Sequence, residues 1–246
     1  MRTTDIRKKL EELGHPVSSL SLGDFDYIGE FTAKKNRDPS SQLYREKGCF
    51  FRPNYERGML IYALVRKHSV RSYLEIGFGR GYSAVCAAKA MTDAGLEGTI
   101  TVVDPVLDEG QISRMSQVFP AAWLSRIRYA KGESAVVLPQ IKERFDMVYI
   151  DGDHRYDAVK GDWAACREMF DRVALFDDYH LPSRAAQADI ECARAIDEIT
   201  DFEKELITMD RRIFHDDRGL TDDQIDYGQV LIEREPAPLP GTCADW

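Results

Sequence analysis

Short apolar runs alternate with amphipathic segments over most of the chain. Five runs are rich in β-branched and aromatic residues, which is typical of strands buried on both faces of a sheet. These runs are 72–76, 99–103, 126–130, 146–150 and 172–176. Two further strands are expected at 203–208 and 228–233. Because strands and helices alternate, the pattern predicts an α/β fold with a doubly wound, Rossmann-like sheet of seven mostly parallel strands.

The helices are predicted from apolar residues that recur three or four positions apart. The clearest helix is 154–170, and another is expected at 184–199 with Ser183 as its N-cap. An apolar helix at 54–67 leads into the main fold.

The chain divides into three parts by pattern. Residues 1–56 form an N-terminal helical or cap extension, with a helix at 4–13 and a polar, turn-rich loop at 34–48. Residues 57–235 form the main domain, and the proline-containing residues 236–246 form a tail. The boundaries predict one large domain with an appendage.

Composition excludes several classes of function. The 246 residues are 43% hydrophobic and carry a net charge of −9, which argues against a nucleic-acid partner. No apolar run reaches the length of a membrane span, and the charged N-terminus lacks the apolar stretch of a secretory signal. The five cysteines show no C-x-x-C spacing, which favours a reducing cytoplasm.

A glycine-rich turn follows the first strand of the main domain. Gly77, Gly79 and Gly81 stand in the spacing G-x-G-x-G between a strand and a helix. Glycine permits a positive φ and lets a ligand approach the backbone, and the helix start offers free N–H groups. A dinucleotide fingerprint would require glycine at position 82, where Tyr82 stands, so an NAD-dependent oxidoreductase is disfavoured.

An acidic residue follows the second strand. Asp104 is placed to accept both hydroxyls of a ribose, and Glu133 and Ser134 after the third strand are placed to flank an adenine. The segments LEIGFGRGYSA, VVDP and KGES, in this order, resemble the S-adenosylmethionine site of the class I methyltransferases.

The resemblance implies roles for particular residues. The three glycines would wrap the amino-acid part of S-adenosylmethionine, Glu75 would order the turn, Asp104 would hold the ribose and Ser134 would lie near the adenine. It also implies that further residues line the cofactor: Phe78, Tyr82, Ser83, Pro105, Glu133 and Asp151.

Acidic residues end two strands that should be neighbours. Asp151 follows the fourth strand, and Asp177 and Asp178 end the fifth. In a sheet that reverses after its first strand, these strands lie beside the glycine turn, so the carboxylates should converge. Because like charges repel, a divalent cation with oxygen ligands would stabilise them.

This arrangement resembles the metal-dependent O-methyltransferases that act on sugar hydroxyls and related small molecules, the macrocin O-methyltransferase-like and cephalosporin hydroxylase-like group with a DGDH motif. The resemblance implies that Asp151, Asp177 and Asp178 bind Mg²⁺ and that Asp153 is the general base. His154 and His180 also follow strands and are alternative bases. Related chains usually carry a Gly-Gly turn before the fifth strand, where this chain has Met-Phe-Asp-Arg at residues 169–172.

Three interpretations therefore remain open. The main one is a cytoplasmic, Mg²⁺-dependent O-methyltransferase acting on a small hydroxylated molecule. The alternatives are a metal-independent small-molecule methyltransferase and a non-catalytic protein that binds S-adenosylmethionine or S-adenosylhomocysteine. If the acids are not functional, Asp153 only caps the following helix and Asp178 only solvates a loop. The oligomeric state is not fixed by the sequence, and a homo-oligomer remains open.

Overall fold

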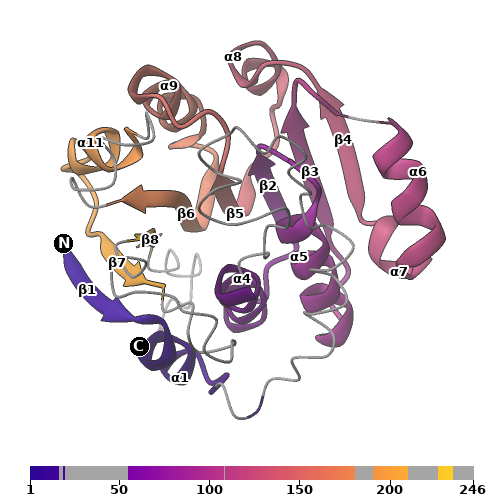
Figure 1. Cartoon of the computed structure of the whole chain (residues 1–246), viewed down its shortest axis with the longest axis horizontal. Coiled ribbons are helices and arrows are strands. Elements are labelled where there is room, and N and C mark those ends of the chain that lie inside the picture. The colour runs from indigo at the N-terminus through magenta and orange to yellow at the C-terminus, as the bar shows by residue number, and fades with distance from the viewer. Residues whose placement is uncertain (17–18, 20–54, 108, 181–190, 210–226, 235–246) are drawn as a thin grey trace, which may run out of the picture.

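The computed structural model describes residues 1–16, 19, 55–107, 109–180, 191–209 and 227–234. Within these residues a single eight-stranded sheet crosses the molecule in the order β1-β7-β8-β6-β5-β2-β3-β4 (Figure 1). The strands are β1 Arg2–Asp5, β2 Ser72–Ile76, β3 Thr99–Asp104, β4 Ile127–Lys131, β5 Phe145–Ile150, β6 Phe170–His180, β7 Glu205–Thr208 and β8 Tyr227–Glu233. All neighbours pair in parallel except β8, which is antiparallel to β6 and β7. The predicted doubly wound, mostly parallel α/β sheet is confirmed.

The strand order determines where a ligand would bind along the carboxyl ends of the strands. β2 lies between β3 and β5, and β6 follows β5. The spatial order of the strands therefore reverses after β2, as predicted. In such sheets ligands bind beyond the carboxyl ends of the strands at the point of reversal.

Helices cover both faces of the sheet, and each face has its own apolar core (Figure 1). On one face lie α1 Ile6–Glu12, α4 Tyr55–Lys67 and α5 Tyr82–Asp93. On the other face lie α9 Tyr156–Cys166 and α11 Cys192–Asp197. The shorter or peripheral helices are α6 Glu109–Val118, α7 Ala121–Leu124, α8 Ser134–Val137 and the 3₁₀ turn η2 Leu138–Gln140. Successive residues of β2 face opposite cores, with Tyr73 in the first and Leu74 in the second.

The N-terminus differs from the prediction. The expected helix at 4–13 is preceded by an edge strand, β1, so the sheet has eight strands among the described residues rather than seven. β1 pairs in parallel with β7, with Thr3 opposite Leu206. The backbone of this short polar segment pairs with β7. A strand that forms by such pairing cannot be predicted from the pattern of hydrophobic residues. Asp5 ends the strand and caps α1 by accepting the Arg7 N–H at 2.8 Å.

Two predicted helices also differ from the structure. The predicted helix 154–170 ends at Cys166, and Phe170 instead begins β6, where it pairs with Phe145 of β5. Phe170 continues the helical spacing, but its backbone completes the sheet. Of the predicted helix 184–199 the structure describes α11, and Ser183 lies outside the described residues, as do the loop at 34–48 and the tail at 236–246. The domain limits remain a prediction. None of the helices in the described ranges is long and apolar enough to cross a bilayer.

Candidate functional site

The glycine turn follows β2, and all three of its glycines adopt a positive φ. The φ angles are +90° at Gly77, +52° at Gly79 and +83° at Gly81. A Cβ on Gly77 would lie 2.0 Å from the carbonyl oxygen of Asp151, and a Cβ on Gly81 would lie 2.6 Å from the Phe78 ring. Gly79 is exposed, and a Cβ there would meet nothing within 4 Å. The turn thus needs glycine for packing at its two ends and presents an open backbone in the middle.

Glu75 lies beneath the turn in a fully buried position. Its carboxyl group accepts hydrogen bonds from the Ser83 hydroxyl at 2.7 Å and from the Tyr73 hydroxyl at 3.1 Å. Burial raises the pKa of Glu75 to about 8. The side chain therefore joins β2 to the first turn of α5, which is an ordering role of the kind that the resemblance implied.

Asp104 ends β3 and holds the glycine turn from the other side. One carboxylate oxygen accepts the N–H groups of Phe78 at 2.8 Å and Gly79 at 3.3 Å. The other oxygen accepts the Val106 N–H at 2.6 Å. A carboxylate has about four lone-pair sites, so these three bonds leave capacity for a ribose hydroxyl.

The remaining predicted cofactor residues fall into two groups. Phe78 and Tyr82 are buried, Phe78 with its ring edge against Tyr129 and Tyr82 against Tyr55. Their side chains belong to the apolar core, so these two residues would offer a ligand only their backbone. Pro105 and Glu133 are exposed, and Ser134 is half-buried at the start of α8.

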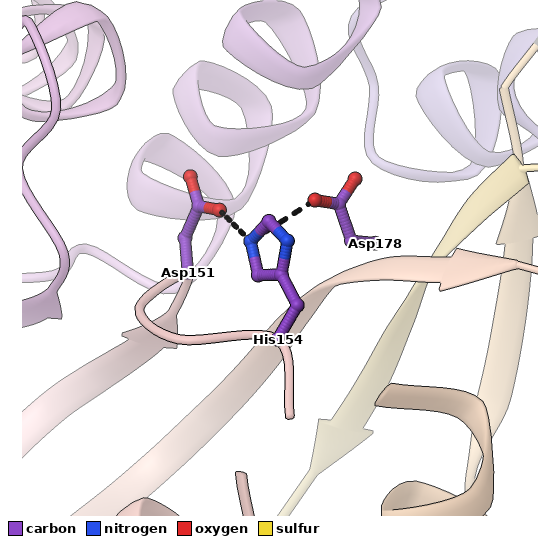
Figure 2. Close-up of side chains that lie close together, drawn as sticks. All are labelled: Asp151, His154 and Asp178. Carbon is purple, nitrogen blue, oxygen red and sulfur yellow. Dashed lines mark ion pairs between the residues drawn. The ribbon is translucent and has the colours of Figure 1, made fainter. Parts of the chain in front are cut away.

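The acidic end of the site is formed by three side chains, two from the loop after β5 and one from within β6. One ligand atom from each of Asp151, His154 and Asp178 lies within 4.8 Å of the others (Figure 2). His154 Nε2 is 3.1 Å from Asp178 Oδ2 and 3.8 Å from Asp151 Oδ1. We call these three residues the acid group. The structure thus brings together two of the three predicted metal ligands and one of the alternative bases.

A backbone irregularity positions Asp178. Its φ is +51°, which is uncommon for a residue other than glycine, and the pairing of β6 with β8 shifts register between Phe176 and Tyr179. Such bulges redirect a side chain and recur beside functional sites. Asp177 and Asp178 are consecutive, but only Asp178 joins the acid group.

Asp177 is directed elsewhere. Its carboxylate is 2% exposed, contacts the Arg57 guanidinium of α4 and accepts a hydrogen bond from Gln229 of β8 at 2.9 Å. Arg57 Nη1 also contacts Asp151 Oδ2 at 3.0 Å. The sequence analysis missed Arg57 and Gln229, because nothing in their spacing links them to an acid 120 and 52 residues away, respectively.

The charges in the cluster compensate one another. Burial, followed by the neighbouring Asp177, raises the pKa of Asp151 to about 6, whereas Arg57 lowers it. The neighbouring carboxylates of Asp151 and Asp178 raise the pKa of His154 to about 9. In the structure as it stands, Arg57 and a protonated His154 therefore balance most of the negative charge.

Asp153 lies outside the acid group. Asp153 contacts the guanidinium of Arg155 and accepts its N–H at 3.0 Å, and Arg155 lowers the pKa of Asp153. The N-cap of α9 is Arg155, so Asp153 is not the cap residue that the non-functional interpretation required. His180 is the last residue of β6, and its side chain is not described.

Comparisons with known proteins agree with this fold. The methyltransferase domain family matches residues 74–179, which include the glycine turn, Asp104 and the acid group. A curated relative from Mycobacterium sp. (strain JLS), named "Putative O-methyltransferase", is 28% identical over 97 residues. That match covers 39% of this chain and 43% of the relative, so it spans less than half of either protein.

Solved structures show the same fold over most of the chain. The O-methyltransferase TomG from Streptomyces achromogenes, in complex with S-adenosylmethionine, is 18% identical with a TM-score of 0.56 over 81% of this chain and 91% of its own. An O-methyltransferase from Bacillus cereus, in complex with S-adenosylhomocysteine, is 14% identical with a TM-score of 0.58 over 93% and 97%. Residues 74–179 therefore match the methyltransferase domain family, and the solved structures show the class I fold that the resemblance implied.

Proposed function

We propose that this protein transfers the methyl group of S-adenosylmethionine to a hydroxyl oxygen of a small molecule and uses a divalent cation at the acid group. The observation that carries the proposal is the direct contact between the glycine turn and the loop after β5. The Asp151 N–H donates to the Ile76 carbonyl at 2.9 Å, and Gly77 has no room for a Cβ against Asp151. A ligand on the turn would thus lie beside the acid group.

The residues around the turn fit S-adenosylmethionine. Gly79 offers open backbone, Asp104 offers a carboxylate for the ribose, and Ser134 stands at the start of α8 for the adenine. The solved relatives in complex with S-adenosylmethionine and S-adenosylhomocysteine share this fold, which supports the assignment.

The acid group fits one divalent cation. Two carboxylates and an imidazole offer three donors within 4.8 Å of one another. Carboxylate oxygens suit Mg²⁺, and the imidazole makes Mn²⁺ an equally good fit. When bound there, a cation would lower the pKa of a hydroxyl oxygen beside it. His154 must lose its proton to act as a ligand, so cation binding would release a proton.

Proton removal from the acceptor falls to a side chain of this protein. We assign it to Asp153, the general base that the resemblance implies, which stands two residues after Asp151. The glycine turn and Asp104 would hold the sulfonium in line with the hydroxyl. Alignment would supply much of the catalysis, because the sulfonium is already a strong electrophile.

A second candidate is a methyltransferase that needs no cation. The observation that favours it is the pairing of the acids with Arg57 and His154, which already compensates their charges. In that case His154, held between Asp151 and Asp178, would have to lose its proton before it could act as the base in place of Asp153.

The test begins with S-adenosylhomocysteine binding by calorimetry on the purified protein. Methyl transfer from labelled S-adenosylmethionine to a panel of catechols and sugar hydroxyls follows, with and without EDTA, and with Mg²⁺ or Mn²⁺ restored. We expect binding, and turnover that EDTA abolishes and either cation restores. Turnover that survives EDTA would select the second candidate. Binding without turnover on any acceptor would favour the non-catalytic alternative, and no binding would contradict both enzymes.

A further inference from the structure

Arg57 joins two strand ends that the proposed mechanism treats separately. It lies in the first turn of α4, and its side chain is 20% exposed. Its Nη1 contacts Asp151 Oδ2 at 3.0 Å and also contacts Asp177 Oδ2. Asp151 belongs to the acid group, whereas Asp177 does not. One guanidinium nitrogen therefore links an acid at the site to an acid in the core.

The hydrogen bonds continue into a closed ring. Tyr149 of β5 donates to the same Asp151 oxygen at 3.2 Å. Gln229 of β8 donates to Tyr149 at 3.4 Å and to Asp177 Oδ1 at 2.9 Å. Arg57, Asp151, Tyr149, Gln229 and Asp177 thus form what we call the Arg57 ring, with members on or next to α4, β5, β6 and β8.

The ring fixes the orientation of each polar group in it. An ionised Asp177 can only accept, so the Gln229 amide must turn its NH₂ toward Asp177. In that orientation the buried Gln229 Oε1 has no hydrogen-bond partner among the described residues. An unsatisfied buried carbonyl destabilises the folded state, so folding stability alone does not account for the arrangement.

The ring also decides which oxygen of Asp151 reaches the acid group. Oδ2 is engaged by Arg57 and Tyr149, and Oδ1 is the atom that lies 3.8 Å from His154. Figure 2 shows one Asp151 oxygen turned toward the His154 ring and the other turned away from it. Without the guanidinium, the nearby Asp151 and Asp177 carboxylates would repel each other and Asp151 would be free to rotate.

We propose that Arg57 is a positioning residue for the acid group. Through the ring it holds Asp151 so that only Oδ1 faces His154 and Asp178, and it keeps Asp177 as a support for Asp151 instead of a ligand. The inference rests on the proposed function, because it takes the acid group as the cation site. It adds that this site takes one oxygen from Asp151 and none from Asp177.

The experiment compares Arg57→Met with Arg66→Met in the full chain. Arg66 lies on the same helix, and its Nη1 donates to Tyr62 at 3.0 Å, so this control removes the same charge away from the acids. Mn²⁺ alone is the probe, and its Kd is measured by electron paramagnetic resonance. We expect about 10-fold to 100-fold weaker Mn²⁺ binding in Arg57→Met and no change in Arg66→Met. Arg57→Lys, which keeps the charge but not the planar fork, should be intermediate.

Two results would overturn the inference. Unchanged Mn²⁺ affinity in Arg57→Met would show that the ring does not position Asp151. Tighter binding would show that Arg57 competes with the cation instead of preparing its site. Circular dichroism establishes that each variant is folded, and if Arg57→Met is not, the comparison of Arg57→Lys with wild type decides in the same way.

Failure of the proposed function would look different. S-adenosylhomocysteine calorimetry on the wild type tests the cofactor site without involving Arg57. If the wild type binds S-adenosylhomocysteine but no Mn²⁺, the cation site is wrong, and a crystal structure of Arg57→Lys then decides the positioning role. An Asp151 carboxylate that keeps its wild-type orientation in that structure, with the lysine away from it, would reject the role. A rotated carboxylate would support it.

Discussion

The glycine turn and the acid group are in contact through Gly77 and Asp151, but they are built from different parts of the chain. The turn is formed by backbone geometry: three positive φ angles and the N–H groups that Asp104 accepts. The acid group is formed by side chains whose positions depend on distant partners, Arg57 of α4 and Gln229 of β8. A local sequence pattern can specify the first region, whereas the second depends on how helices and strands pack.

The two regions also handle charge differently. Beneath the turn, Glu75 is buried with two hydroxyl donors, and burial favours its neutral form. In the acid group, the carboxylates face Arg57 and His154, which compensate their charge. We expect substitutions in the first region to change cofactor binding and stability, and substitutions in the second to change turnover and cation binding.

The largest effect is expected from Gly77→Ala, which should disturb both the glycine turn and the acid group. In Gly77→Ala the new Cβ would lie 2.0 Å from the Asp151 carbonyl oxygen, at a φ of +90°. S-Adenosylhomocysteine binding should become undetectable by calorimetry. The control is Gly95→Ala, where φ is +63° and a Cβ meets nothing within 4 Å. The control should lose about 1–2 kcal/mol of unfolding free energy from backbone strain, and Gly77→Ala about 1–3 kcal/mol more from the collision. Equal losses in urea unfolding would contradict the contact between the regions.

Asp178→Asn should affect the acid group but not the glycine turn. Loss of the carboxylate next to His154 should lower turnover at ordinary Mg²⁺ by more than about 100-fold, while S-adenosylhomocysteine affinity stays near that of the wild type. Asp171→Asn serves as the control, since Asp171 is exposed at the start of the same strand and pairs with Arg144 at 2.7 Å. Initial rates and calorimetry measure the two quantities. Retained turnover in Asp178→Asn would remove this residue from the site.

Asp104→Ala should show the reverse pattern. It loses a ribose acceptor and the acceptor for two N–H groups of the turn. A charged hydrogen bond contributes about 1.5–3 kcal/mol, so S-adenosylhomocysteine affinity should fall about 10-fold to 100-fold. Asp146→Ala is a matched control, because Asp146 accepts the N–H groups of Arg71 and Ser72 at the other end of β2. Weakened binding in both variants would mean that the effect is only a loss of stability.

The smallest expected effect is a pH dependence of stability from Glu75. Its folded-state pKa of about 8 lies above the ordinary value of 4.5 because of burial. The stability linked to its proton is therefore fully present below about pH 4.5 and is lost as the pH rises toward about 8. Glu75→Gln should remove this pH dependence. The unfolding free energy of the variant, measured in urea, should therefore rise relative to that of the wild type between pH 5 and 8. The control is Glu109→Gln, an exposed change of the same kind, whose curve of unfolding free energy against pH should run parallel to that of the wild type. A parallel curve for Glu75→Gln would refute the raised pKa of Glu75.

The sequence by itself determined the parallel sheet, the glycine turn and the convergence of Asp151 and Asp178, because period, turn chemistry and strand order act locally or follow from topology. It missed β1, whose four polar residues have no pattern of their own and become a strand only by pairing with β7. It also counted Asp177 with its neighbour, because adjacent residues look equivalent in a motif. Only the tertiary structure decided that a bulge turns Asp178 toward His154 while Asp177 faces Arg57 and Gln229. The physical reason is that a buried carboxylate is oriented by its counter-charge and donors, and these come from helices and strands far away in the chain.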